Sequence, residues 1–319
     1  MFKCSRSVLA ACLVWLTAAS AQADIIFNVS FLDVVNSTGV GFDDPTLGST
    51  RRDTFSSVFT YLNTVLDETG TVDFEVGVSE TDGTGSLASG GTLFPTTGEL
   101  FFNGALFNRV DTGVDISGAE GIASFDFGYN WNSDLDSPTG SEYDLFSVTL
   151  HEVAHALGIL GTIESTGVSS LSGGDPGVFS VFASFLQRGD GTPLFAAGGD
   201  YLGTAADLIS DDVFFGGANA TAANGGTPVE IYAPGAFAPG SSISHIVFPD
   251  AVMQFAIGLG DERRSFNSVE VGILQDIGWT VASASSSAAV PEPGTMAFAV
   301  VGLAGVGVLS RRRRRKANG

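Results

Sequence analysis

Two histidines stand four residues apart in the stretch His151-Glu152-Val153-Ala154-His155. On a helix, residues at this spacing project from one face a turn apart, so both imidazoles can reach a single metal ion. Glu152 lies beside the first histidine, where its carboxylate can serve as general base toward a water at the metal. The whole chain has only three histidines, and two fall in this stretch. The spacing therefore predicts a metal-binding helix, against the plainer alternative of two solvated or core histidines.

The flanking residues favour a helix that begins near Asp144 and ends near Gly158. Asp144 suits the N-cap, and Gly158 is placed as a C′ glycine. Upstream, residues 125–131 alternate aromatic with small or polar side chains, which is typical of a strand, and the polar linker 132–143 follows. The apolar stripe that we expect to face the core consists of Leu145, Val148, Val153, Ala156 and Leu157.

Residues 1–23 have the three parts of a secretory signal peptide: a basic start, an apolar core at 8–19 and a small-x-small cleavage site at 21–23. A lipoprotein cleavage site before Cys12 is the alternative, but it leaves a very short apolar core. Both cysteines of the chain lie in this segment. We therefore expect the exported domain to have neither a disulfide nor a thiol.

The C-terminal residues 290–319 combine the motif Val290-Pro291-Glu292-Pro293-Gly294, an apolar run at 295–309 and the basic cluster 311–316. This order closely resembles the PEP-CTERM sorting tails of Gram-negative bacteria. The resemblance implies passage of the tail into the inner membrane, basic end in the cytoplasm, and processing by an exosortase. A plain membrane anchor is the alternative. The Ser/Ala segment 283–289 is interpreted as a flexible linker into the tail.

The remaining segment, 24–282, is strongly acidic. It has six arginines and no lysine against 34 carboxylates, a net charge of −28. Such a charge excludes nucleic acid and anionic membrane surfaces as partners of this domain. It suits a protein kept soluble outside the cell and favours cation binding, and the apolar content argues against disorder.

Hydrophobic patterning predicts a strand at 25–31, a helix over 55–66, a strand at 72–78 and a last helix capped by Asn267 or Ser268. H-E-x-x-H is the signature of zinc peptidases, and the element order resembles the upper lobe of zincin-type peptidases. The resemblance implies an α+β fold of two lobes. The upper lobe has a twisted sheet with two helices; the lower lobe is irregular, has one C-terminal helix, and is formed largely by an insertion at 162–244.

A catalytic zinc usually has three protein ligands and an open position for water. In the metzincins, which this chain resembles, the third ligand is a histidine six residues after the second, but that position is Gly161 here. Leishmanolysin-like relatives insert a long segment first, and His245 fits that variant. Met253, the only methionine of 24–282, then matches the family's Met-turn. The alternative ligand is a carboxylate, with Glu164 or Asp175 as the nearest candidates.

The resemblance implies a secreted zinc endopeptidase that acts on polypeptides. Zinc held by His151, His155 and His245 would lower the pKa of its water, and Glu152 would move the proton. Some metzincins use a tyrosine two residues after the methionine as oxyanion donor, but this chain has Phe255, which leaves backbone N–H groups, Tyr232 or an arginine.

The alternative function is a catalytically inactive zincin-like protein of the extracellular matrix. A calcium site is a weaker hypothesis, because the loop that would supply its ligands departs from the EF-hand pattern. The oxygen ligands of that loop would be Asn132, Asp134, Asp136 and Glu142.

Overall fold

The computed structural model describes residues 24–94 and 100–282. The expected signal peptide, the linker 283–289 and the tail 290–319 lie outside these residues. Within the described part, no helix combines the length and the apolar character needed to cross a membrane. The fold is a mixture of helices and strands, so the predicted α+β class is confirmed at that level.

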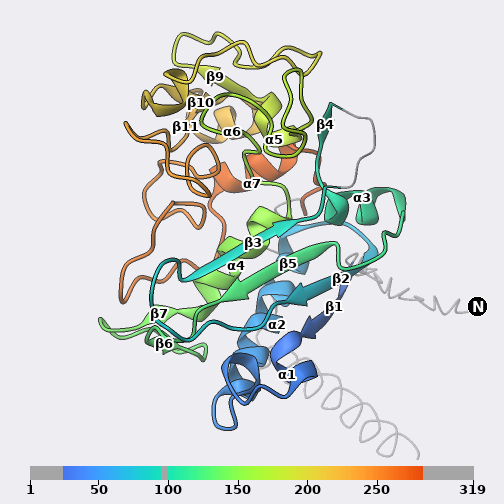
Figure 1. The fold of residues 1–319 in the computed structure, drawn as a ribbon, viewed down its shortest axis with the longest axis vertical. Helices are drawn as coiled ribbons and strands as arrows, with labels where there is room; N and C mark the ends of the chain where they lie inside the picture. The colour runs from blue at the N-terminus through green and yellow to red at the C-terminus, as the bar shows by residue number, and fades with distance from the viewer. Residues whose placement is uncertain (1–23, 95–99, 283–319) are drawn as a thin grey trace, which may run out of the picture. The chain divides into compact units, whose positions relative to one another are not determined.

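A four-stranded sheet forms one half of the domain (Figure 1). β1 and β2 pair in parallel along their whole length, and β2 continues in parallel to β5. β3 closes the edge and runs antiparallel to β5. Alternation explains the central strand, because Val72, Phe74 and Val76 are buried while their neighbours are not. The strands, in sheet order, are β1 (Ile25–Phe31), β2 (Gly70–Val76), β5 (Gly121–Phe125) and β3 (Ala88–Thr92).

Two helices, α2 (Gly48–Val65) and α4 (Leu145–Ala156), lie together on one face of this sheet (Figure 1). Phenylalanines fill the space between α2 and the strands. Phe55 makes edge-to-face contacts with Phe74 and Phe125 at centroid distances of 5.9 and 6.0 Å. Phe59 stacks on Phe27 at 4.1 Å. These pairs are favourable beyond the area that they bury.

The observed α2 begins at Gly48, earlier than the predicted helix over 55–66. Asp44 explains the difference, because its side chain accepts hydrogen bonds from the N–H groups of Thr46 and Leu47 just ahead of the helix. The strand predicted at 125–131 was wrongly placed, because the observed β5 covers Gly121–Phe125 and shares only Phe125 with the predicted range. β5 ends at Phe125 because the Asp126 side chain turns the chain there by accepting the Gly128 N–H at 2.7 Å.

The segment 162–244 is more regular than expected. It contains a three-stranded antiparallel sheet in the order β11-β10-β9 and two short helices around a buried aromatic core, so the expectation of an irregular lobe with a single helix was wrong. Isolated runs of two or three apolar residues carry no periodicity that would mark these strands. The elements are α5 (Val181–Ser184), β9 (Leu186–Arg188), η2 (Asp207–Ile209), β10 (Val213–Phe215), α6 (Ala218–Ala223) and β11 (Val229–Glu230).

The last helix, α7, packs closely against α6. At Gly272 of α7, a Cβ would lie 2.7 Å from the backbone of Ala220 in α6. As predicted, Asn267 caps α7, and it does so in a full capping box. The remaining elements are α1 (Leu32–Asn36), η1 (Gly41–Asp43), β4 (Phe101–Phe102), α3 (Ala105–Thr112), β6 (Trp131–Asn132), β7 (Tyr143–Asp144), β8 (Phe179–Ser180) and α7 (Ser268–Asp276).

Helix α4 begins as predicted, with the Asp144 carboxylate accepting from the Ser147 N–H at 3.0 Å. The same carboxylate is fully buried and is held by Arg264 through two bonds of 2.6 and 2.9 Å. Gly158 follows the helix with φ of +105°, which is consistent with its predicted role. The start of the helix is therefore anchored by an ion pair to the segment that precedes α7.

Replacing Asp144 with alanine is expected to lower the free energy of unfolding by about 3–5 kcal/mol, because a partly buried arginine loses its partner and the helix loses its N-cap. Urea denaturation measures the change. Asp261→Ala is the control, since it removes the partner of Arg263 at a site where the carboxylate side chain is 49 % exposed; such a pair contributes about 1 kcal/mol or less. Equal effects of the two substitutions would contradict the prediction.

Candidate metal centre

The three histidines of the chain converge on one point. His151 and His155 project from the same face of α4, and His245 reaches them from a segment 94 residues after His151. Their ring centroids form a nearly equilateral triangle with sides of 4.8, 5.0 and 4.9 Å. One nitrogen of each ring lies within 4.8 Å of the other two. The structure thus brings together all three predicted ligands.

Each histidine is oriented by a backbone carbonyl on its outer side. The Nδ1 atoms of His151, His155 and His245 lie 2.7 Å from the carbonyl oxygens of Val252, Ile159 and Ser241 respectively. A carbonyl only accepts, so Nδ1 carries the proton in each ring and Nε2 carries the lone pair. Two of these Nε2 atoms, on His151 and His245, are 3.1 Å apart. Converging lone pairs repel one another unless a cation lies between them, and carbonyl-bonded Nδ1 atoms are usual in metal-ligating histidines.

Burial keeps the imidazoles neutral. Desolvation, with a smaller contribution from His245, lowers the pKa of His151 from 6.5 to about 3. The pKa of His155 lies well below its ordinary value, and that of His245 is also lowered, again mainly through burial. Neutral imidazoles are the form that binds a metal. The donor set of three neutral nitrogens fits Zn²⁺.

Glu152 is 6 % exposed and lines the same cleft as the three histidines. Burial raises the pKa of its carboxyl from 4.5 to about 8. A carboxyl with a pKa near neutrality can both accept and return a proton, which suits a general base that later acts as an acid. The residue thus lies where the sequence predicted it, beside the histidines and open to the cleft.

The cleft has a volume of about 440 Å³ and lies between α4, the edge strand β3 and the segment around Met253. Strand and helix approach so closely that a Cβ on Gly90 would overlap the backbone of Glu152. Glycine at this position of β3 therefore sets the distance between the sheet edge and the helix. Among the described residues, the cleft lining has no ionisable side chain apart from Glu152 and the histidines.

The absence of a histidine at position 161 has a structural explanation. A Cβ on Gly161 would overlap the carbonyl of Ile243, and the Gly161 N–H donates to the Ser244 hydroxyl at 3.1 Å. The chain that leaves α4 is therefore met at this point by the segment that returns with His245. The alternative ligands Glu164 and Asp175 do not join the cluster of described ligand atoms around the two helical histidines.

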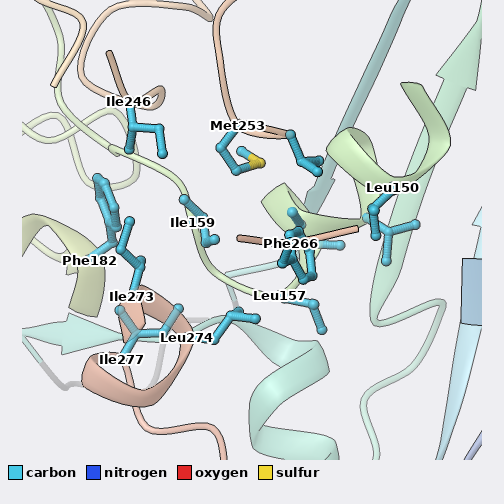
Figure 2. Packing of buried hydrophobic residues seen from close by; sticks show 14 of the residues in the cluster. Leu150, Leu157, Ile159, Phe182, Ile246, Met253, Phe266, Ile273, Leu274 and Ile277 are labelled. Atoms are coloured by element: carbon cyan, nitrogen blue, oxygen red, sulfur yellow. The ribbon is translucent and has the colours of Figure 1, made fainter. Parts of the chain in front are cut away.

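Met253 is fully buried in a core shared with Leu150 of α4, with Leu157 just after that helix, and with Ile273 and Leu274 of α7 (Figure 2). Its carbonyl accepts the Ile246 N–H at 3.0 Å, so the turn after His245 closes on itself. Met253 is therefore a buried residue of the turn that follows the third histidine, and its role as a Met-turn stays a prediction.

Of the candidate oxyanion donors, Tyr232 stacks on Phe255 with ring centroids 4.0 Å apart and an interplanar angle of 9°. Phe255 lines the cleft and is 47 % exposed. At position 255 the cleft is therefore lined by an aromatic ring, which has no hydroxyl to donate to an oxyanion.

The loop of the proposed calcium site is bound by the guanidinium of Arg264. Arg264 donates to the carbonyl of Asp136 at 2.8 Å and also to that of Leu135. The side chains of Asn132 and Asp134 accept N–H groups of the same loop. The fold brings together a second cluster of carboxylates, which the sequence did not indicate: Glu80, Asp82 and Asp126. Two of its members lie in the loop after β2 and the third directly follows β5, so they are neighbours only in the folded chain.

Stripped of metal by a chelator, the protein is expected to be most stable between about pH 6 and pH 7 and to lose stability as the pH falls further. Burial raises the pKa of Glu152 to about 8 and that of Glu270 to about 7, so the native state holds protons that the unfolded chain releases at 4.5. Their effect is that stability rises as pH falls toward 4.5. The three histidines act oppositely and outnumber the two glutamates, because the unfolded imidazoles gain protons below pH 6.5, whereas burial lowers the native pKa values, that of His151 to about 3.

Below pH 4.5 the two glutamates have no further effect, and stability continues to fall because carboxylates whose pKa is lowered in the native state, such as Asp207, must also be protonated. Urea denaturation midpoints between pH 8 and pH 3 measure the profile. A midpoint that decreases steadily from pH 8 to pH 6 would contradict the prediction.

Comparison with known proteins identifies one segment. Residues 289–315 match the PEP-CTERM protein-sorting motif, so the predicted sorting tail is confirmed. The motif is associated with exosortase-type processing enzymes and with export to the cell surface in Gram-negative bacteria. No curated protein matches the chain. The match covers only the tail, so the function of residues 24–282 has to be inferred from their own sequence and structure.

Proposed function

We propose that this protein is an exported zinc endopeptidase whose zincin-like, two-lobed domain spans 24–282. The observation that carries the proposal is the convergence of three Nε2 lone pairs, each fixed by a carbonyl on Nδ1. His151, His155 and His245 would hold the zinc. The signal peptide predicted at 1–23 and the confirmed sorting motif support export by way of the inner membrane.

Zinc, when bound, supplies a Lewis acid that polarises the scissile carbonyl and activates water. The protein's own part is proton transfer. Glu152 takes a proton from the attacking water and delivers it to the departing amine nitrogen, and its raised pKa suits both steps. The cleft beside it provides room for an extended chain along β3. Away from Glu152 and the histidines, the described lining is uncharged, so it accepts apolar side chains without leaving a buried charge unpaired.

The proposal is tested with the full chain, purified and analysed for zinc. Incubation with casein and with a mixed peptide library, followed by mass spectrometry, should reveal internal cleavage. A chelator should stop the cleavage, and added zinc should restore it. Stoichiometric zinc at the three histidines without cleavage of any peptide would overturn the proposal in favour of a non-enzymatic surface protein.

A further inference from the structure

A single peptide group links the motif helix to a buried carboxylate. The carbonyl of the Val252–Met253 peptide accepts from Nδ1 of His151 at 2.7 Å. The N–H of the same peptide donates to Oε1 of Glu270, also at 2.7 Å. The order is carboxylate, peptide, imidazole, with both ends of one amide occupied.

Glu270 is held firmly in this position. It is fully buried in the first turn of α7, and its second oxygen accepts the N–H of Asn267 at 2.9 Å in the capping box. Val269, Ile273 and Leu274 of α7 are also buried in the core. The carboxylate is therefore presented by a rigid helix end rather than by a mobile loop.

The other two histidines lack such support. In the Ile159–Leu160 peptide, the N–H of Leu160 donates to the carbonyl of Gly158. In the Ser241–Ser242 peptide, the N–H of Ser242 donates to the carbonyl of Ala238. Both acceptors are neutral and belong to local turns. His151 is thus the one ligand of the three whose carbonyl partner is backed by a carboxylate.

The electrostatic consequence follows from the direction of the dipoles. A negative charge at the N–H end of an amide polarises it and makes its oxygen a stronger acceptor. A stronger bond to Nδ1–H fixes the ring orientation and makes Nε2 a better donor to a metal, as carboxylate–histidine–metal arrangements do by direct contact. Arg263 steadies the same turn by donating to the carbonyl of Ala256 at 2.8 Å.

We propose that Glu270 is a positioning residue that aligns His151 for zinc through the Val252–Met253 peptide. The inference rests on the zinc site of the proposed function and does not require that the site be catalytic. Burial raises the pKa of Glu270 to about 7, so the carboxylate is ionised at pH 8, where it should be tested.

The test compares Glu270→Gln with Asn267→Ala in the full chain. Asn267→Ala removes the two bonds that the Asn267 side chain accepts from the N–H groups of Val269 and Glu270. It leaves the bond from the Met253 N–H to Glu270, so it is the control for loss of the helix cap alone. We measure zinc affinity at pH 8 by competition with a chelator, and the absorption spectrum of the Co²⁺-loaded protein. Thermal denaturation reports stability separately.

Glu270→Gln should weaken zinc binding by about 10-fold or more, as loss of an outer partner does, and should change the Co²⁺ spectrum. Asn267→Ala should lower the melting temperature and leave both metal readouts at the wild-type values. Wild-type affinity in Glu270→Gln, or equal weakening in both variants, would overturn the inference while the proposed function stands. A zinc-binding wild type that cleaves no peptide would overturn the proposed function, and the affinity comparison would still decide the role of Glu270.

Discussion

Replacing Glu152 with glutamine is expected to reduce peptide hydrolysis by about 10²–10⁴-fold or more while the protein keeps its zinc. Glutamine has nearly the same shape, so the 6 % exposed site should stay packed. It cannot accept and return a proton, and proton transfer is the one step that the proposal assigns to this residue. The effect should appear in kcat with little change in KM, because the carboxylate is needed in the transition state rather than for binding.

Hydrolysis rates for a fixed peptide and zinc content by elemental analysis, measured on the same samples, give the result. Glu164→Gln is the matched control, since Glu164 is an exposed carboxylate on the segment that follows α4. It should leave both quantities unchanged. Full activity in Glu152→Gln would remove the general base from the proposal, whereas loss of zinc would show that the substitution disturbs the metal site itself.

Replacing His245 with alanine is expected to abolish activity and to weaken zinc binding as strongly as His151→Ala does. The two histidines of α4 alone would leave zinc with two protein ligands and loose geometry. The loss should exceed the roughly 10–100-fold effect of removing an outer partner. The fold should persist, because the hydrophobic core around Met253 does not include the imidazole.

Zinc titration and circular dichroism of the two histidine variants check this expectation. Asp175→Ala and Glu164→Ala serve as controls for the carboxylate alternative, because Asp175 is committed to the Tyr201 N–H at 3.1 Å and neither residue reaches the histidines in the described cluster. If His245→Ala keeps full zinc and activity while one of the carboxylate variants loses both, the third ligand is a carboxylate. The metzincin resemblance would then fail, and the zincin one would survive.

The parts of this protein that depend on local physical chemistry could be predicted from the sequence. The spacing of His151 and His155 defines one helix face, Asp144 caps that helix, and Asn267 caps the last one. The sorting tail could be predicted for the same reason, since its motif, apolar run and basic cluster are contiguous. Each of these features involves residues within a few turns of one another.

The pairing of the strands could be predicted less well from the sequence. β3 has the sequence Ala-Ser-Gly-Gly-Thr, which carries no hydrophobic alternation, yet it forms the edge of the sheet because β5 supplies its hydrogen bonds and α4 packs against Gly90. The strands β9 to β11 are two or three residues long and are stabilised by contacts with one another. Such elements owe their existence to neighbours distant in the chain, which no short window of sequence contains.

The metal centre shows most clearly what only the tertiary structure decided. His245 was a candidate from the sequence because it was the only histidine left, but its position beside His151 depends on the return of the chain to Gly161, where a side chain would block the Ile243 carbonyl. The part played by Glu270 depends on an amide whose two ends face different elements. The sequence by itself determined which groups could bind a metal, since that is a property of side chains and local spacing; the fold decided which of them meet, because only packing brings residues about a hundred positions apart within hydrogen-bond distance.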